Sequence, residues 1–177
     1  MKRINVTIEG ISPLLMHRFP MEPIEAIEKK EPKEQAAISL YQIDDKPYIP
    51  GVNLQRALVA SATFSKGKGR ASLQKPVAAG LFVDEELLFL NGKTSPWVID
   101  SRPVVVPATK GRIVRHRPKF EKWQVDFTIS FDETLLTATQ VRQVVDDAGS
   151  RVGVLDFRPE KKGPFGRFMV TRWEEVK

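Results

Sequence analysis

The sequence has no cysteine and two histidines among its 177 residues. Without cysteine it cannot form a disulfide scaffold, a thiolate zinc or iron–sulfur site, or a cysteine nucleophile, and two histidines argue against a histidine-rich metal centre. Apolar runs fall far short of the ~20 residues of a membrane span. The N-terminus, Met-Lys-Arg-Ile-Asn-Val, is unlike a signal peptide. We expect a cytoplasmic protein of one domain, residues 1–177, without cofactor or membrane partner.

Basic residues are in excess and clustered. Lys and Arg total 28 against 22 Asp and Glu, a net charge of +6. Residues 64–76 hold four basic residues and no acid, residues 110–122 hold six and one acid, and residues 150–172 hold six and two acids. Because clustered positive charge favours polyanionic partners, this pattern indicates nucleic acid.

Hydrophobic periodicity predicts an α+β chain in the order β-α-β-β-α-β. The expected core elements are strands at 4–8, 123–131 and 166–174, a helix at 52–63, and a helix with a Thr137–Gln140 capping box that stops at Gly149. The expected connections are a solvated excursion at 19–35, a hairpin turn at 44–47, a basic loop at 64–76, and an extended run at 97–107 that turns at 109–111 into a basic β-hairpin arm at 112–117. This order is that of ferredoxin-like domains.

Three segments carry more specific motifs. The first strand runs into Ser12-Pro13-Leu14, the segment from Tyr48 to Leu58 places Ile-Pro-Gly before a helix with a basic residue, and a basic glycine-rich segment runs from Gly153 to Phe168. Together they resemble the RAMP superfamily, the RRM-like fold of CRISPR-associated RNA-binding proteins. The resemblance implies a ferredoxin-like or RRM-like sheet with two helices on one face, and insertions at about 19–47 and 64–120.

Within that superfamily the backbone subunit that lines guide RNA in CRISPR effectors is the most similar in shape. The Asp-Phe-Arg-Pro and Gly-Pro-Phe-Gly-Arg-Phe elements also resemble uncharacterised phage and prophage proteins. The resemblance therefore implies a bacterial or phage-infected cell.

Four segments are candidates for contact with a sugar–phosphate backbone. In the glycine-rich loop, Gly163 and Gly166 permit close backbone approach, and the candidates are Arg158, Lys161, Lys162, Arg167 and, for base stacking, Phe165. At the helix start they are Gly51, Asn53 and Arg56, because free N–H groups there bind phosphate. In the arm the candidates are Arg112, Arg115, His116, Arg117 and Lys119. In the 64–76 loop they are Lys66, Lys68 and Arg70. Two further candidates, His17 and Arg18, follow the first strand. Each segment has a structural alternative. The glycine-rich loop could be a solvated turn and Asn53 a helix cap. The arm could be a charged edge that prevents aggregation, and the 64–76 loop a solvated linker.

Catalysis has weaker support. His17 and His116 have no partner that can be identified from sequence, and Asp146 and Asp147, adjacent on a helix, cannot face one way. Asp156 lies among arginines and is expected to order Arg158 or Arg151 rather than hold magnesium. We expect neither catalysis nor a metal.

The strand at 123–131 places its aromatic and aliphatic residues on one face, which the core requires, and so lacks the exposed aromatics of a typical RRM. We expect a non-enzymatic protein that binds single-stranded RNA or DNA with little sequence preference, in several copies along the strand. The alternatives are a guide-RNA backbone subunit, a RAMP metal-independent endoribonuclease, and a phage protein that binds a host protein.

Overall fold

The computed structural model describes residues 1–67 and 69–177. A four-stranded antiparallel sheet holds β1 (Lys2–Gly10), β5 (Leu81–Val83), β9 (Gln124–Phe131) and β10 (Phe168–Glu175) in the order β10-β1-β9-β5. Because β1 and β5 both run antiparallel to β9, which separates them, they are parallel to each other. This is a split β-α-β unit, so the α+β fold fits a ferredoxin-like arrangement.

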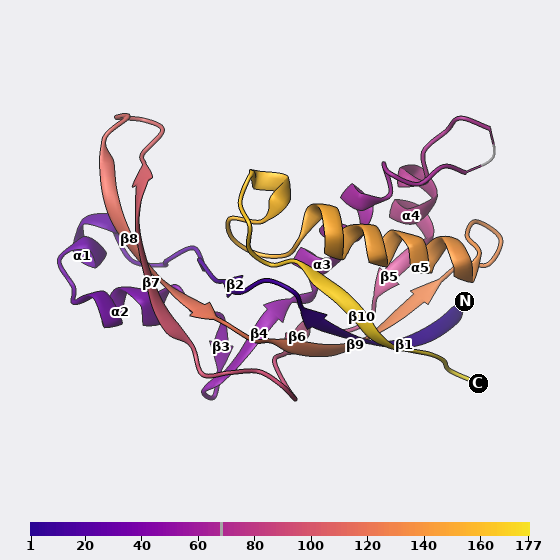
Figure 1. Cartoon of the computed structure of the whole chain (residues 1–177), viewed down its shortest axis with the longest axis horizontal. Coiled ribbons are helices and arrows are strands. Elements are labelled where there is room, and N and C mark those ends of the chain that lie inside the picture. Colours follow the sequence, from indigo (N-terminus) through magenta and orange to yellow (C-terminus); the bar gives the residue numbers. More distant parts are fainter. Residues whose placement is uncertain (68) are drawn as a thin grey trace.

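Two helices, α3 (Gly51–Ser61) and α5 (Ala138–Asp147), cover one face of this sheet (Figure 1). Alternate residues of β9 point toward them, so Val125, Phe127, Ile129 and Phe131 are buried as the alternating pattern predicts. The capping box at the start of α5 is confirmed: Thr137 Oγ1 accepts from Gln140 N–H at 3.2 Å, and Gln140 Oε1 accepts from Thr137 N–H at 2.9 Å.

The predicted stop of this helix at Gly149 is wrong. The chain continues through a π-helical turn, Ala148–Val152, and the helical conformation ends at Gly153, whose φ is +74°. Gly149 instead packs against β10, where a Cβ would collide with the Phe168 carbonyl. Its lack of a side chain therefore serves packing, and Gly153 supplies the left-handed conformation that ends a helix.

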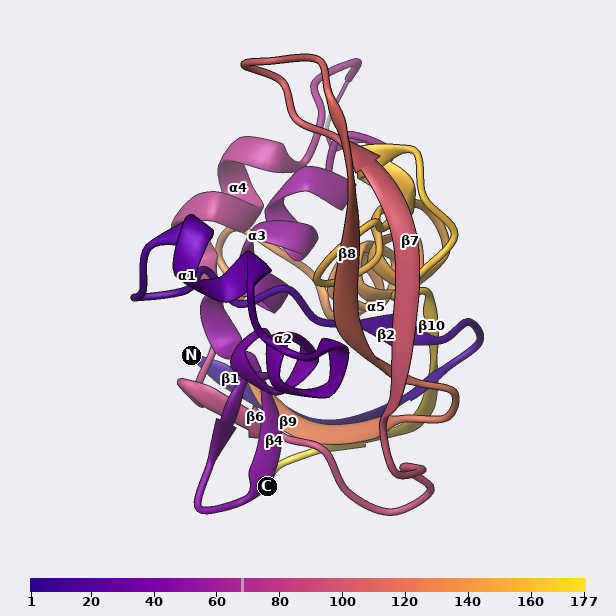
Figure 2. The same cartoon turned by 90° about the vertical axis from the view of Figure 1, so that its left-hand side faces the viewer.

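A second sheet forms the predicted arm. It contains β2 (Leu14–Leu15), β7 (Val98–Val105) and β8 (Arg112–Phe120) in the order β2-β8-β7. Lys110, at φ +53°, closes the predicted turn, and its N–H donates to the Val106 carbonyl at 2.7 Å. Pro103 lies on β7, an edge strand, which is where a strand tolerates proline. The arm stands beside the first helices of the chain (Figure 2).

A third small sheet joins β3 (Gln42–Ile43), β4 (Lys46–Pro50) and β6 (Leu87–Phe89). The turn between β3 and β4 falls at Asp44-Asp45, within the hairpin turn predicted at 44–47, and Lys46 and Pro47 belong to β4. Asp44 and Asp45 both have positive φ, at 50° and 59°, which is the geometry of a two-residue hairpin turn.

Residues 19–35 are mostly exposed and none belongs to the core cluster, as a solvated excursion predicts, but the segment is also helical, which the sequence analysis did not predict. These residues form α1 (Ile24–Glu28) and most of α2 (Pro32–Ile38), and Ile27 and Ala36 are buried. The basic loop expected at 64–76 is shorter, because Leu73 is buried and α4 (Gln74–Gly80) follows it. Lys68, a predicted site residue, lies outside the described residues.

Candidate nucleic-acid interface

A cluster of charged and aromatic side chains joins the base of the arm to the glycine-rich loop, residues 153–167. Arg102 Nε and Nη2 both donate to the Asp100 carboxylate at 2.7 Å, and these bonds hold the pKa of Asp100 below its ordinary value. The Arg102 guanidinium lies over the rings of Phe165 at 4.8 Å and Phe157 at 5.5 Å. Phe165 is only 6% exposed, so its ring offers no open face to a base and its predicted stacking role is wrong.

The partner of Asp156 also differs from the expectation. Arg117, which is 5% exposed, donates from Nη1 to Asp156 Oδ2. Arg158 bonds Glu160 instead, and Arg151 bonds Asp147. Because Arg117 is buried and paired, its predicted contact with an open strand surface is not supported.

The glycines of the loop allow the chain to approach itself. Gly166 has φ +74°, and a Cβ there would collide with the Val154 carbonyl. At Gly163 a Cβ would collide with the Phe157 carbonyl. The predicted close approach is therefore internal to the loop, and it leaves Lys161 and Lys162 exposed on the outside.

The start of α3 is not the phosphate site that the sequence predicts. Gly51 is buried, and its N–H donates to the Glu86 carbonyl at 2.7 Å. Asn53 does not cap the helix: its Oδ1 accepts from Leu155 N–H at 3.0 Å and so ties the glycine-rich loop to α3. Arg56 is exposed on the same helix.

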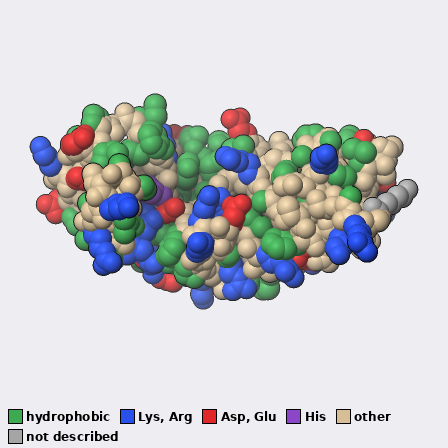
Figure 3. Space-filling view, turned by 90° about the horizontal axis from the view of Figure 1, so that it is seen from above, with side chains coloured by type: hydrophobic (Ala, Val, Ile, Leu, Met, Phe, Trp, Pro, Cys, Tyr) green, Lys and Arg blue, Asp and Glu red, His purple; other side chains and the backbone are tan. Residues whose placement is uncertain are grey.

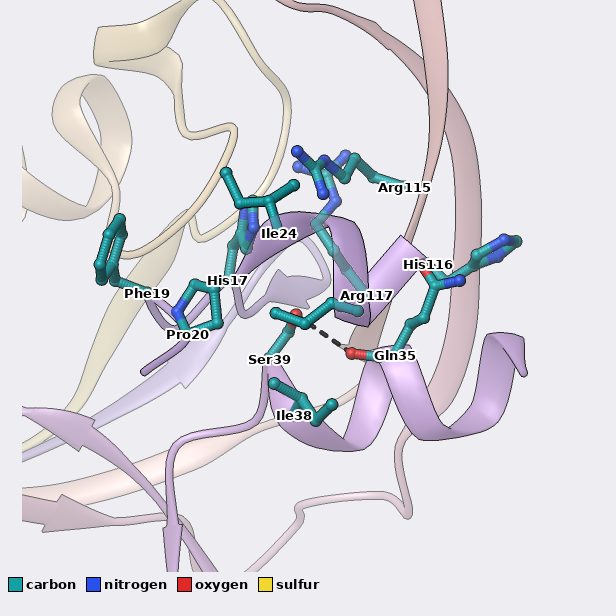
Figure 4. A pocket seen from close by; sticks show the side chains of 11 residues that line it. His17, Phe19, Pro20, Ile24, Gln35, Ile38, Ser39, Arg115, His116 and Arg117 are labelled. Atoms are coloured by element: carbon teal, nitrogen blue, oxygen red, sulfur yellow. Dashed lines mark hydrogen bonds between the residues drawn. The ribbon is translucent and has the colours of Figure 1, made fainter. Parts of the chain in front are cut away.

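The two histidines line one pocket, yet they lie differently (Figure 4). His17 Nδ1 is 3.9 Å from Asp156 Oδ2, and burial, reinforced by Arg117 and Arg115, lowers the pKa of His17 despite the opposing effect of Asp156. The His116 ring points away from His17 and its Nδ1 is 2.6 Å from Ser101 Oγ. The imidazoles therefore do not form an acid–base pair.

Seven predicted cations share two properties: they are exposed, and within the described residues they make no ion pair. They are Arg18 and the six that we call the basic surface, namely Arg56, Lys66, Arg70, Arg112, Lys161 and Lys162. The segments that carry the last five, namely the arm tip, the glycine-rich loop and the 64–73 loop, rise on one side of the molecule (Figure 1). Seen from that side, Lys and Arg side chains are spread along the length of the face (Figure 3).

Two grooves flank the glycine-rich loop. One, of about 600 Å³, lies between α3 and the glycine-rich loop, and Arg56 and Lys161 line it. The other, of about 500 Å³, lies between β7 and the same loop, and Arg102 and Lys161 line it. Lys161 belongs to both grooves, so they meet at the glycine-rich loop, between β7 of the arm and α3.

The other predicted residues lie around this surface. Arg18 is exposed, Arg115 and Arg167 are partly buried, and Lys119 pairs with Glu121 at 2.8 Å. The sequence analysis missed Arg102. Its signal was the Asp100–Arg102 spacing, which places opposite charges on one face of a strand.

Among the described residues, no group of three or more His, Cys, Asp or Glu side chains could hold a metal ion. The described helices include none that is both long and apolar enough to cross a membrane.

No protein-family model matches the sequence, and no curated protein matches it. Among solved structures the chain is similar to one in the cryo-EM structure of Type III-B Cmr-beta bound to cognate target RNA, with a TM-score of 0.67 and 11% sequence identity. The match covers 99% of this chain and 61% of that one, so this chain spans less than two thirds of its length. The likeness supports the mixed α+β fold that the sequence predicts and assigns the chain to no family.

Proposed function

We propose that this protein binds single-stranded RNA through the sugar–phosphate backbone, as a non-enzymatic protein of RAMP type. The observation that carries the proposal is the basic surface: six exposed cations, unpaired within the described residues, come from segments far apart in the sequence. Five of them lie on segments that rise on one side, and Arg56 and Lys161 line the two grooves that meet at Lys161. Backbone phosphates are the ligand that such a surface of point charges suits. The similar solved chain comes from a structure bound to target RNA, which favours RNA over DNA.

The opposite face of the four-stranded sheet is a poor platform for RNA. Thr7 Oγ1 donates to Asp126 Oδ1, and Asn91 Nδ2 donates to Asp126 Oδ2 at 2.8 Å, so a carboxylate lies in the middle of that face. Phosphate would be repelled there, and on that face the described residues of the four strands offer bases no exposed aromatic pair of the RRM kind. The strand is therefore expected on the side of the loops and the arm.

The decisive experiment compares oligo-U and oligo-dT of equal length by fluorescence anisotropy at one stated salt concentration. Tighter binding of oligo-U supports the proposal, equal binding extends it to both nucleic acids, and no binding of either at low salt refutes it. Native purification with a 260/280 absorbance ratio tests whether RNA accompanies the protein.

We also propose that several copies line up along one strand, as backbone subunits of CRISPR effectors do. Sizing with RNAs of increasing length should then show complexes whose mass rises in steps. A mass that stays at one copy, whatever the RNA length, contradicts this part of the proposal and leaves RNA binding untouched.

The absence of catalysis is part of the proposal. Because the His116 ring points away from His17, no pair of imidazoles is available for proton transfer. Labelled RNA incubated with the protein, with and without magnesium, should stay intact. If the protein cleaves RNA and either His17→Ala or His116→Ala abolishes the cleavage, the proposal is wrong and the alternative function, a metal-independent endoribonuclease, takes its place.

A further inference from the structure

An exposed phenylalanine and an exposed arginine are stacked where the 64–73 loop meets α5 and the π-helical turn after it. The Arg151 guanidinium lies over the Phe64 ring, 5.0 Å from the ring centroid. Phe64 is 52% exposed, and the Arg151 side chain is 57% exposed. Neither residue belongs to the core cluster, so the pair is part of the molecular surface.

A buried carboxylate holds this pair in place. Asp147 is 6% exposed, and its Oδ1 accepts from Arg151 Nε at 3.1 Å. Its Oδ2 accepts from Ser65 Oγ at 3.2 Å and from Gln143 Nε2 at 3.2 Å. Because Ser65 directly follows Phe64, one carboxylate fixes both the loop that carries the ring and the guanidinium over it. Groups ordered in advance lose little freedom when a ligand binds, which favours affinity.

The pair borders a pocket of about 340 Å³, within the roughly 300–1,000 Å³ of small-molecule sites. Phe64, Lys66, Gln140 and Arg151 line it, with Asp147 at its base paired to Arg151. Lys66 is exposed and belongs to the basic surface, so the lining carries a net positive charge. A flat ring beside a free cation suits a ligand with a planar group and a nearby phosphate, which is the chemistry of a nucleotide.

Phe64 differs from the other exposed phenylalanines of the described chain, which are Phe19, Phe82 and Phe89. It is the one carried by a segment of the basic surface, the 64–73 loop. Phe82 and Phe89 lie on β5 and β6, and Phe19 precedes α1. A strand whose phosphates contact that loop therefore passes the Phe64 ring.

We propose that the Phe64–Arg151 pair is a stacking platform for one base of the bound strand, an inference that rests on the proposed RNA binding and adds a base contact to it. The base lies against the Phe64 ring, and Lys66 binds the phosphate beside it. Aromatic rings and guanidinium planes are the surfaces on which proteins stack unpaired bases. Every base has a π face, so the platform accepts any base and is consistent with little sequence preference.

The test compares oligo-U with an abasic oligoribonucleotide of equal length, which keeps the phosphates and lacks the bases. By fluorescence anisotropy the wild-type protein should bind oligo-U at least about fivefold more tightly, as one stacked base contributes that much or more. Phe64→Ala should weaken oligo-U binding by about fivefold or more and leave the affinity for the abasic oligomer unchanged. The matched control is Phe82→Ala, an exposed phenylalanine outside the pocket, which should change neither affinity.

A second pair of variants separates stacking from packing. Phe64→Tyr keeps a ring and should keep the affinity for oligo-U, whereas Phe64→Leu keeps only an apolar side chain and should bind as weakly as Phe64→Ala. Because the side chain is exposed, thermal melting should show every variant folded. Photocrosslinking of the wild-type protein to an oligomer that contains 4-thiouridine should label peptides with residues 64–66 or 140–151.

Equal binding of oligo-U and the abasic oligomer by the wild-type protein, with the expected salt dependence, would overturn the platform and leave backbone binding standing. An equal loss of both affinities in Phe64→Ala would overturn it as well, since the ring would then serve only the structure of the loop. Crosslinks confined to other segments would have the same consequence. No binding of either oligomer at low salt would refute the proposed function itself, and with it this inference.

Discussion

Replacing the two lysines of the glycine-rich loop, in Lys161→Ala/Lys162→Ala, should reduce RNA affinity by an amount that depends on salt. Both side chains are exposed and make no ion pair among the described residues, so the free energy of unfolding should change by less than about 0.5 kcal/mol. Any loss of binding would then come from lost phosphate contacts and not from unfolding.

The magnitude follows from the six cations of the basic surface. At about 0.7 per contact for a single strand, the slope of log affinity against log salt should be about −4.2 for the wild-type protein and about −2.8 for the double variant. Between about 50 and 200 mM salt the wild-type protein should lose about 340-fold in affinity, and the variant about 50-fold.

The assay is fluorescence anisotropy of labelled oligo-U at several salt concentrations, with thermal melting of each protein. The control is Lys29→Ala/Lys33→Ala, which removes two exposed charges from the acidic α1–α2 segment, away from both grooves. It should keep the wild-type slope. An unchanged slope in the Lys161/Lys162 variant, or an equal loss in the control, would refute the assignment of the glycine-rich loop to the RNA-binding surface.

Other substitutions test the architecture beneath this surface. Gly166→Val should lower stability and RNA binding together, since φ +74° strains a β-branched residue and its Cβ would collide with the Val154 carbonyl; melting and anisotropy measured in parallel check this. Asp156→Ala should cost about 2–4 kcal/mol in urea unfolding because it leaves Arg117 buried and unpaired, whereas Asp156→Asn, which keeps an acceptor, should cost less. The folded protein lowers the pKa of His17 from 6.5, so as the pH falls His17 is protonated in the unfolded chain before it is protonated in the folded one. The free energy of unfolding should therefore be highest above about pH 6.5 and should decrease as the pH falls below it. His17→Gln should flatten that part of the profile of stability against pH.

Local chemistry explains which elements were predictable. The Asp44-Asp45 turn, the Thr137 capping box and the alternating strand at 123–131 each depend on residues close in sequence. The amphipathic pattern of α3 was equally clear. Helices α1 and α2 were missed because their sequence is rich in prolines and charges and offers few buried apolar residues, such as Ile27 and Ala36. The arm lies beside these helices in the folded protein, and the sequence pattern does not show that neighbour.

The candidate site was predictable in composition and less so in detail. Exposed lysines and arginines follow from the sequence, because an unpaired cation in a glycine-rich or turn segment stays in water. Three predicted residues do not belong to the proposed surface, because groups from distant segments cover them. The Glu86 carbonyl covers Gly51, the Asp156 carboxylate covers Arg117, and the Arg102 guanidinium covers Phe165.

The sequence by itself determined three strands and two helices of the core, the arm and the three basic segments, because periodicity and clustered charge are local properties of the chain. It placed β5, the remaining strand of the core sheet, inside the insertion expected at about 64–120. Tertiary structure alone decided that those segments rise on one side, that Asp156 selects Arg117, and that Arg115 and Arg117 meet Phe19 at one pocket. Each of these depends on contacts between segments of the chain that are distant in sequence, and pairings at that separation leave no local signal in the residue pattern.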